Sequence, residues 1–381
     1  MKEVSYVVVF PSIFSKNKIP QLISNIKKIL KIRNQEFQSI KRDGDIILVN
    51  ASDPVFSSSA INLIFGIEKV AIARQVKNEF KTLVSEITSL GGNLLLKGER
   101  FLVKVEGTSK GFFPKDVEIA AISSIIEKKS NLGARPGTDE NYDKLLYTFL
   151  TKKNAYISIF IDKGQGGTTF NSQKQNTISC IYDELSAVSC FETIKQGFDS
   201  KIIVCYRKNS ELINLVKTIN QIIPRLVKEK ISLDFFQVKI NSNGTKNYQI
   251  FINSVIEILL HEADKNQLNY VSLPLSPLFF SQDFIESSMK KVFQNNKFPI
   301  FPLNGVDSKL FDEAKEIGLE KQIPKLKKTI LMNSKEIPKI LAKNLKSAIS
   351  SKKTVDVVIG PNNVHDILDS LEENHSEFKR H

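Results

Sequence analysis

Residues 177–206 read TISCIYDELSAVSCFETIKQGFDSKIIVCY. The runs at 177–182 and 201–206 are short and rich in apolar and β-branched residues, as buried strands are. The segment between them has the apolar spacing of a helix. The same alternation continues to residue 317, and it predicts a parallel sheet flanked by helices, a doubly wound α/β domain. The further elements expected are strands at 233–239 and 269–273 and helices at 209–228, 248–265, 284–294 and 308–317.

The residues before this domain predict two smaller units with a different order of elements. From residue 4 to residue 74 the patterns follow the order strand–helix–strand–strand–helix–strand, which is that of a ferredoxin-like α+β domain. Asp43-Gly44 lies between two strand-like runs and is a strong hairpin signal. A second α/β unit follows, with helices expected at 78–90 and 115–129 and strands at 100–106, 144–150 and 155–161.

Shifts in composition mark the boundaries between these units. Residues 164–176 begin with Gly164-Gln165-Gly166-Gly167 and hold no large aliphatic side chain, which predicts a linker. Near the C-terminus, residues 354–359 predict a strand and residues 364–373 a helix. We therefore expect domains at 1–70, 71–163 and 177–345, a linker at 164–176, and a strand–helix element at 346–381.

The net charge of the chain is +13, with 54 lysines and arginines against 41 acidic residues. Phosphate contacts dominate nucleic-acid affinity, so this excess favours a polyanionic partner. A general enrichment in lysine is the alternative, because most of the charge comes from lysine and not from arginine. The three cysteines and four histidines show no metal-ligand spacing, which predicts no disulfide frame and no metal site. No apolar run is long enough to span a membrane, and we expect a cytoplasmic protein.

Four short motifs resemble those of the tRNA 4-thiouridine synthetases. They are Lys41–Ile46, Leu63–Ile67, Gly164–Gly167 and the pair formed by Pro302–Asp307 and Ile317-Gly318. Their order and spacing carry the resemblance. It implies a ferredoxin-like domain, a THUMP RNA-binding domain and a PP-loop ATP pyrophosphatase domain. Members of that family bind tRNA through the first two domains, adenylate a uridine with ATP, and replace the activated oxygen with sulfur from a cysteine persulfide.

The phosphate-binding loop of that family is replaced in this sequence. The family uses SGGxDS between a strand and a helix, where glycines let backbone N–H groups approach the pyrophosphate. Counting from Gly166-Gly167 places the motif on Ile181, Tyr182, Asp183, Glu184, Leu185 and Ser186, of which only Ser186 agrees. Gly197-Phe198-Asp199-Ser200 resembles the end of such a loop, but it follows a helix pattern and precedes a strand. We therefore predict a degenerate loop at 181–186.

Two further requirements of the thiolation chemistry are unmet. The region from Leu319 onward, where the family carries its sulfur-bearing cysteine, has none. Cys180, Cys190 and Cys205 are expected in the core. The family's adenosine-contact motif lines up with residues 273–282, where two residues agree. The sequence predicts no catalytic residue and no cofactor; ATP with Mg²⁺ is expected only if the chain is an active enzyme.

Basic residues in the first two units are the candidates for RNA contact. Arg135 is the best single candidate because it lies in a Gly/Pro loop, and loops on a rigid scaffold often carry function. Scattered solvated lysines are the alternative, since residues 101–150 carry no net charge. Phe112 and Phe113 are expected to be core residues, with an exposed stacking pair as the alternative. The candidate RNA-binding residues are Lys27, Lys28, Lys31, Arg100, Lys104, Lys110, Lys115, Lys128, Lys129 and Arg135.

The sequence as a whole predicts a tRNA-binding protein related to 4-thiouridine synthetases and without adenylation activity of its own. Two alternatives stay open: an active tRNA sulfurtransferase that uses ATP and an external sulfur carrier, and a protein-interaction module with vestigial RNA binding. The expected partner is tRNA. An active tRNA-modifying enzyme and a second copy of the chain are open as further partners.

Overall fold

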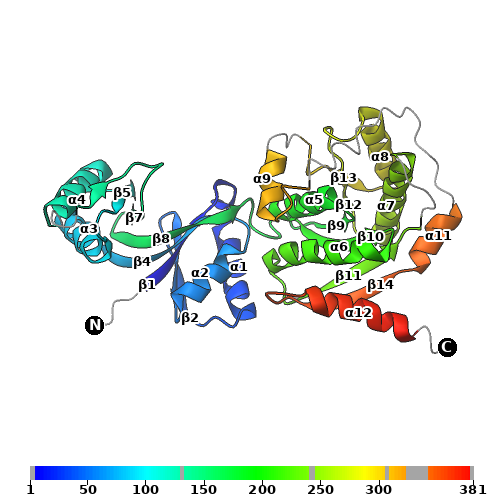
Figure 1. Cartoon of the computed structure of the whole chain (residues 1–381), viewed down its shortest axis with the longest axis horizontal. Coiled ribbons are helices and arrows are strands. Elements are labelled where there is room, and N and C mark those ends of the chain that lie inside the picture. The colour runs from blue at the N-terminus through cyan, green and yellow to red at the C-terminus, as the bar shows by residue number, and fades with distance from the viewer. Residues whose placement is uncertain (1–4, 129–132, 240–244, 305–308, 323–341, 378–381) are drawn as a thin grey trace. The chain divides into compact units, whose positions relative to one another are not determined.

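The computed structural model describes residues 5–128, 133–239, 245–304, 309–322 and 342–377 (Figure 1). The chain divides into two compact units, residues 1–169 and residues 170–381. This division falls inside the stretch 164–176 that the sequence marks as a linker. Among the described helices, none is long and apolar enough to cross a membrane.

In the described part of the first unit, eight strands form one sheet in the order β2-β3-β1-β4-β8-β7-β5-β6. β5 pairs in parallel with β6 and β7, and the other pairs are antiparallel. The boundary expected at 70/71 falls within β4, so the two smaller units predicted from the sequence share this sheet. The strands are β1 (Ser5–Pro11), β2 (Phe37–Asp43), β3 (Ile46–Ala51), β4 (Ile67–Lys77), β5 (Arg100–Gly107), β6 (Arg135–Pro136), β7 (Lys144–Leu150) and β8 (Asn154–Gly166).

Local sequence signals set the start of helix α2 and the hairpin between β2 and β3 in the first unit. Asp53 caps one helix by accepting hydrogen bonds from the backbone N–H groups of Val55 and Phe56, at 3.0 and 3.1 Å. The hairpin predicted at Asp43-Gly44 is confirmed, because Gly44 has a φ of +62° between β2 and β3. The helices are η1 (Ile13–Ser15), α1 (Ile19–Ile32), α2 (Pro54–Asn62), α3 (Phe80–Leu94) and α4 (Pro114–Lys128).

The two faces of the first sheet differ in how they are covered. Alternation along β5 sends Phe101, Val103 and Val105 into a core shared with α3 and α4. The opposite face carries a second apolar cluster whose described members come from strands. We call this side of the sheet the open face. Its cluster consists of Val8, Phe10, Ile46, Leu48, Ala71, Ala73, Tyr147 and Tyr156.

The second unit holds the predicted α/β sheet, in the order β13-β12-β9-β10-β11-β14 over its described residues. The pairs from β13 to β11 are parallel, as expected. β14 is antiparallel to β11, so the C-terminal strand expected to stand apart joins the same sheet. The strands are β9 (Asn176–Ile181), β10 (Asp199–Tyr206), β11 (Lys230–Gln237), β12 (Tyr270–Ser272), β13 (Phe298–Ile300) and β14 (Lys353–Val358).

Helices connect these strands in the alternating pattern that the sequence predicts (Figure 1). Lys352 fixes β14, because its ammonium lies 2.9 Å from Asp234 and 2.8 Å from Glu262 on neighbouring elements. The helices are α5 (Glu184–Lys195), α6 (Asn209–Ile222), η3 (Ile223–Arg225), α7 (Thr245–Lys265), α8 (Gln282–Gln294), α9 (Lys309–Glu316), α11 (Ala342–Ser350) and α12 (Val364–Glu377).

Candidate functional site

The degenerate loop lies where a phosphate loop would lie, between β9 and α5. Three of its backbone donors, the N–H groups of Tyr182, Asp183 and Ser186, are already used within the chain. The Oγ atom of Ser186 accepts hydrogen bonds from the N–H groups of Tyr182 and Asp183, at 2.8 and 2.9 Å. The carboxylate of Asp183 accepts from the N–H of Ser186 at 2.9 Å, which completes a capping box. The helix terminus that could bind a phosphate is therefore closed by its own side chains.

Aromatic side chains fill the space beside this loop. Tyr182 is buried and meets Phe251 of α7 edge to face, with the ring centroids 5.5 Å apart. The hydroxyl of Tyr248 donates to Asp183 at 2.5 Å. Burial raises the pKa of the Asp183 carboxyl to about 6, although hydrogen bonds from Tyr248 and Ser186 oppose the shift. A packed acid and two tyrosines thus occupy the place of a glycine cradle.

Neither of the other two motifs compared with the nucleotide site is placed to bind a nucleotide. The motif at 197–200 lies at the wrong edge of the sheet, and part of the segment 273–282 is buried. Asp199 is the first residue of β10, and its carboxylate pairs with Lys228 at 2.5 Å. It therefore lies at the amino end of that strand, whereas α/β sheets bind ligands at the carboxyl ends. Leu273, Leu275 and Ser276 of the segment 273–282 are buried. The three cysteines, expected in the core, are buried as well.

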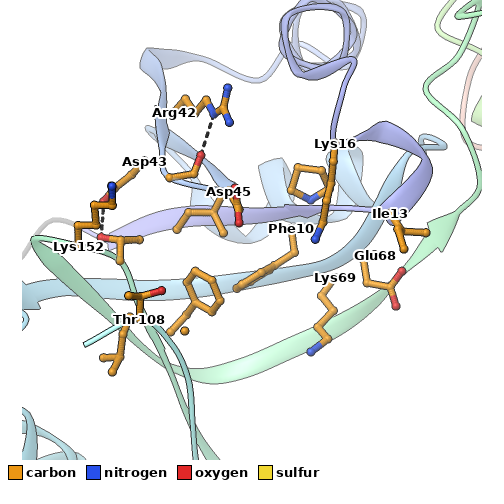
Figure 2. A pocket seen from close by; sticks show the side chains of 17 residues that line it. Phe10, Ile13, Lys16, Arg42, Asp43, Asp45, Glu68, Lys69, Thr108 and Lys152 are labelled. Atoms are coloured by element: carbon orange, nitrogen blue, oxygen red, sulfur yellow. Dashed lines mark hydrogen bonds between the residues drawn. The ribbon is translucent and has the colours of Figure 1, made fainter. Parts of the chain in front are cut away.

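The first unit has a cleft of about 990 Å³ that reaches the open face (Figure 2). Phe10 and Phe149 meet there edge to face, with centroids 5.0 Å apart. Lysines and arginines from separate elements line the same cleft. They are Lys16, Arg42, Lys69 and Lys152, and the sequence analysis did not place them among the candidate RNA-binding residues.

Asp43 ties the β2–β3 hairpin to the neighbouring β7–β8 turn, which also lines the cleft. Its Oδ2 atom accepts hydrogen bonds from Thr151 Oγ1 at 2.9 Å, Asn154 Nδ2 at 3.1 Å and Tyr156 OH at 2.6 Å. Burial and this carboxylate raise the pKa of the Tyr156 hydroxyl well above its ordinary value. The hairpin that carries Arg42 is therefore held to the turn between β7 and β8.

Three of the predicted RNA-binding residues lie together. Strand alternation puts Lys104 on the open face with Arg100, and Arg100 is in register with Arg135 of β6. Arg100 and Lys104 each have a carboxylate partner: Arg100 Nε lies 3.4 Å from Asp143, and Lys104 Nζ lies 3.7 Å from Asp139. Lys69 adds a fourth cation, 5.5 Å from the ring of Tyr147.

The remaining candidates lie elsewhere on the first unit. Lys110, Lys115 and Lys128 are exposed in and around α4, where Lys115 pairs with Glu118 at 2.6 Å. Lys129 lies outside the described residues. Phe112 packs against the α3–α4 core as expected, but Phe113 is 74% exposed, so the expectation of two core residues is wrong for Phe113. The exposed lysines of α1 are Lys27, Lys28 and Lys31.

The signal for the open face was present in the sequence only in part. Alternation in 100–106 predicts that Arg100, Lys104 and Glu106 share a face, but it does not say which other strands flank them. Lys69 and Phe10 reach this face through strand pairs far apart in the chain. Within the described residues, no group of three or more histidine, cysteine or acidic side chains is placed to hold a metal ion.

Comparison with known proteins shows a shared fold. PH1313 from Pyrococcus horikoshii Ot3 is 17% identical, with a TM-score of 0.59 over 83% of this chain and 100% of that one. A 4-thiouridine synthetase, solved as a complex with RNA and bound ATP, is 13% identical, with a TM-score of 0.61 over 93% of this chain and 100% of that one. No protein-family model and no curated protein sequence matches the chain. The fold that the sequence motifs implied is thus confirmed.

Proposed function

We propose that this protein binds tRNA through its first unit and does not adenylate it. The fold supports the proposal, because the chain shares it with a 4-thiouridine synthetase whose structure was solved with RNA and ATP. The loss of adenylation rests on the loop at 181–186. Proteins that share a fold can differ in chemistry, since function depends on the residues of the site.

The observation that carries the proposal is the capping box of Asp183 and Ser186. The N–H groups of Tyr182, Asp183 and Ser186 lie in the loop that would face an ATP phosphate, and all three already donate to side chains. The carboxylate of Asp183 would also repel the negative charge of the phosphate. Binding would require the loop to open and the side chains of Tyr182 and Tyr248 to leave their packed positions.

The open face is the surface that we propose for RNA. Arg100, Lys104 and Lys69 supply positive charge, and Phe149 beside the cleft supplies an aromatic surface. Proteins that bind single-stranded RNA on a sheet combine such cations with aromatic side chains on which bases stack. The cytoplasmic location, an active tRNA-modifying enzyme as a partner and homodimerisation remain predictions beside this one.

Two measurements on one sample of the full chain test the function. The first is binding of bulk tRNA over a series of salt concentrations, and the second is calorimetry with ATP and Mg²⁺. We expect tRNA binding that weakens steeply with salt and no heat of ATP binding. Binding of ATP would contradict the closed loop and favour an active sulfurtransferase. Binding of neither ligand would favour a protein-interaction module.

A further inference from the structure

Glu106 lies on the open face near the carboxyl end of β5, among the cations that would attract RNA. It follows Lys104 by two residues on β5, so both side chains point to the same side of the sheet. Its register partner on β7 is Phe149, the aromatic residue that lines the cleft. The Glu106 side chain is 35% exposed. A carboxylate and an aromatic ring therefore stand side by side on this surface.

The carboxylate of Glu106 is held in place and ionised. The hydroxyl of Tyr147 donates to its Oε2 atom at 2.8 Å, and the ammonium groups of Lys69 and Lys104 lie 3.5 and 3.7 Å from its oxygens. Partial burial raises the pKa of Glu106, but the Tyr147 hydrogen bond and the two lysine charges outweigh it, so the net pKa lies below its ordinary value. The group is thus a preorganised acceptor.

A fixed carboxylate repels phosphate, so this point of the open face suits a base better than the RNA backbone. A base that stacks on Phe149 would turn one edge toward its neighbour Glu106. Carboxylates accept hydrogen bonds from base N–H groups, and a pair of donors matches the two oxygens. The phosphates on either side of that base would meet Lys69 and Lys104.

We propose that Glu106 and Phe149 form a site that selects an unpaired guanine in the bound RNA. Guanine is the base whose Watson–Crick edge presents two adjacent donors, N1–H and the N2 amino group. Cytosine and adenine present one amino group on that edge, and uracil presents one N–H. This inference rests on the proposed RNA binding and adds base selectivity to it.

The test uses five-nucleotide single-stranded RNAs that differ only at the central base, in a uridine background. The central nucleoside is guanosine, inosine, adenosine, cytidine or uridine. Each labelled RNA is titrated with the full chain, and binding is followed by fluorescence anisotropy. Inosine lacks the N2 amino group and keeps N1–H. We expect the guanine RNA to bind about ten-fold more tightly than the inosine RNA, the range that a bidentate base contact supports.

Variants separate base selection from general electrostatics. Glu106→Gln keeps an acceptor for Tyr147 and should remove the preference for guanine. Asp139→Asn is the matched control, because Asp139 also contacts Lys104 but its side chain is 78% exposed; this variant should keep the preference. Phe149→Leu should weaken binding of the guanine RNA by several-fold, as lost base stacking does.

The outcomes distinguish this inference from the proposed function. Equal binding of all five RNAs, or a guanine preference that Glu106→Gln leaves unchanged, would overturn the guanine site and leave RNA binding intact. A uniform rise in affinity for all five RNAs in Glu106→Gln would show a merely repulsive carboxylate, which also overturns it. Failure of the chain to bind both bulk tRNA and every short RNA would instead overturn the proposed function.

Discussion

Asp183 shows how one residue can change what a loop does. An acid at this position caps α5 and accepts from Tyr248, so the helix terminus needs no external anion. The same packing makes ionisation of Asp183 unfavourable. The pKa of about 6 is therefore raised above the ordinary 3.8, so folding favours the protonated carboxyl more than the unfolded chain does.

We expect Asp183→Asn to raise stability at pH 8. For a group whose folded pKa is raised, the stabilising contribution is complete below about pH 3.8 and is lost as pH rises through about 6. Asparagine caps helices as well as aspartate and stays neutral, so the gain should be roughly 1–2 kcal/mol. Urea unfolding at pH 4 and pH 8 measures it. Asp53→Asn, at the exposed cap of α2, is the control and should show no comparable gain.

At the scale of elements, the β2–β3 hairpin depends on a contact that is distant in sequence. Asp43 is part of the local hairpin turn signal, but its partners Thr151, Asn154 and Tyr156 come from the turn after β7 and the start of β8. The hairpin and that turn both line the cleft, so this carboxylate fixes their positions relative to each other there.

Asp43→Ala should destabilise the first unit by roughly 2–4 kcal/mol, because Thr151, Asn154 and Tyr156 each lose a hydrogen bond to this carboxylate and the Tyr156 side chain belongs to the buried apolar cluster. Thermal unfolding followed by circular dichroism measures the change. Asp45→Ala removes an exposed acid of the same hairpin and should shift the midpoint little. Equal shifts in the two variants would contradict the role given to Asp43.

The contact between α5 and α9 should respond to pH. Glu192 lies beside Lys195, Glu313 and Glu316, and burial, the hydrogen bond with Glu313 and its charge raise the pKa of Glu192 to about 8. Stability from protonated Glu192 is therefore complete below about pH 4.5 and is lost as pH rises through about 8. Amide hydrogen exchange in α9 should quicken over that range, after correction for its intrinsic pH dependence.

Glu192→Gln should flatten this response, because glutamine imitates the protonated acid at every pH. Glu286→Gln changes an exposed acid on α8 and serves as the control. If α9 exchanges at the same corrected rate at pH 6 and pH 9 in the unaltered protein, the assignment of the shifted acid to this contact is wrong.

At the scale of the whole molecule, the open face gathers cations from strands that the chain order separates. Arg100→Gln with Arg135→Gln should lower the slope of log affinity for tRNA against log salt by about two, because each phosphate contact contributes close to one. Filter binding over a salt series measures the slope. Lys115→Gln with Lys128→Gln changes the same net charge away from the open face and should leave the slope nearly unaltered.

The sequence by itself determined the elements and much of their order. Alternation and helical spacing depend on neighbours a few residues apart, so the strands at 100–106, 177–182 and 201–206 and the hairpin at Asp43-Gly44 could be predicted. The replacement of the glycines at 182 and 183 was also readable, since backbone approach to a phosphate has a fixed local requirement.

Only the tertiary structure decided what surrounds these elements. Strand pairing brings Lys69, Glu106 and Phe149 to one face, although they are distant in the chain, and packing places Tyr248 against Asp183. It also adds β14 to the sheet as an antiparallel edge, held by Lys352 between Asp234 and Glu262. Local propensity has a range of a few residues, whereas these contacts join residues that become neighbours only when the chain has folded.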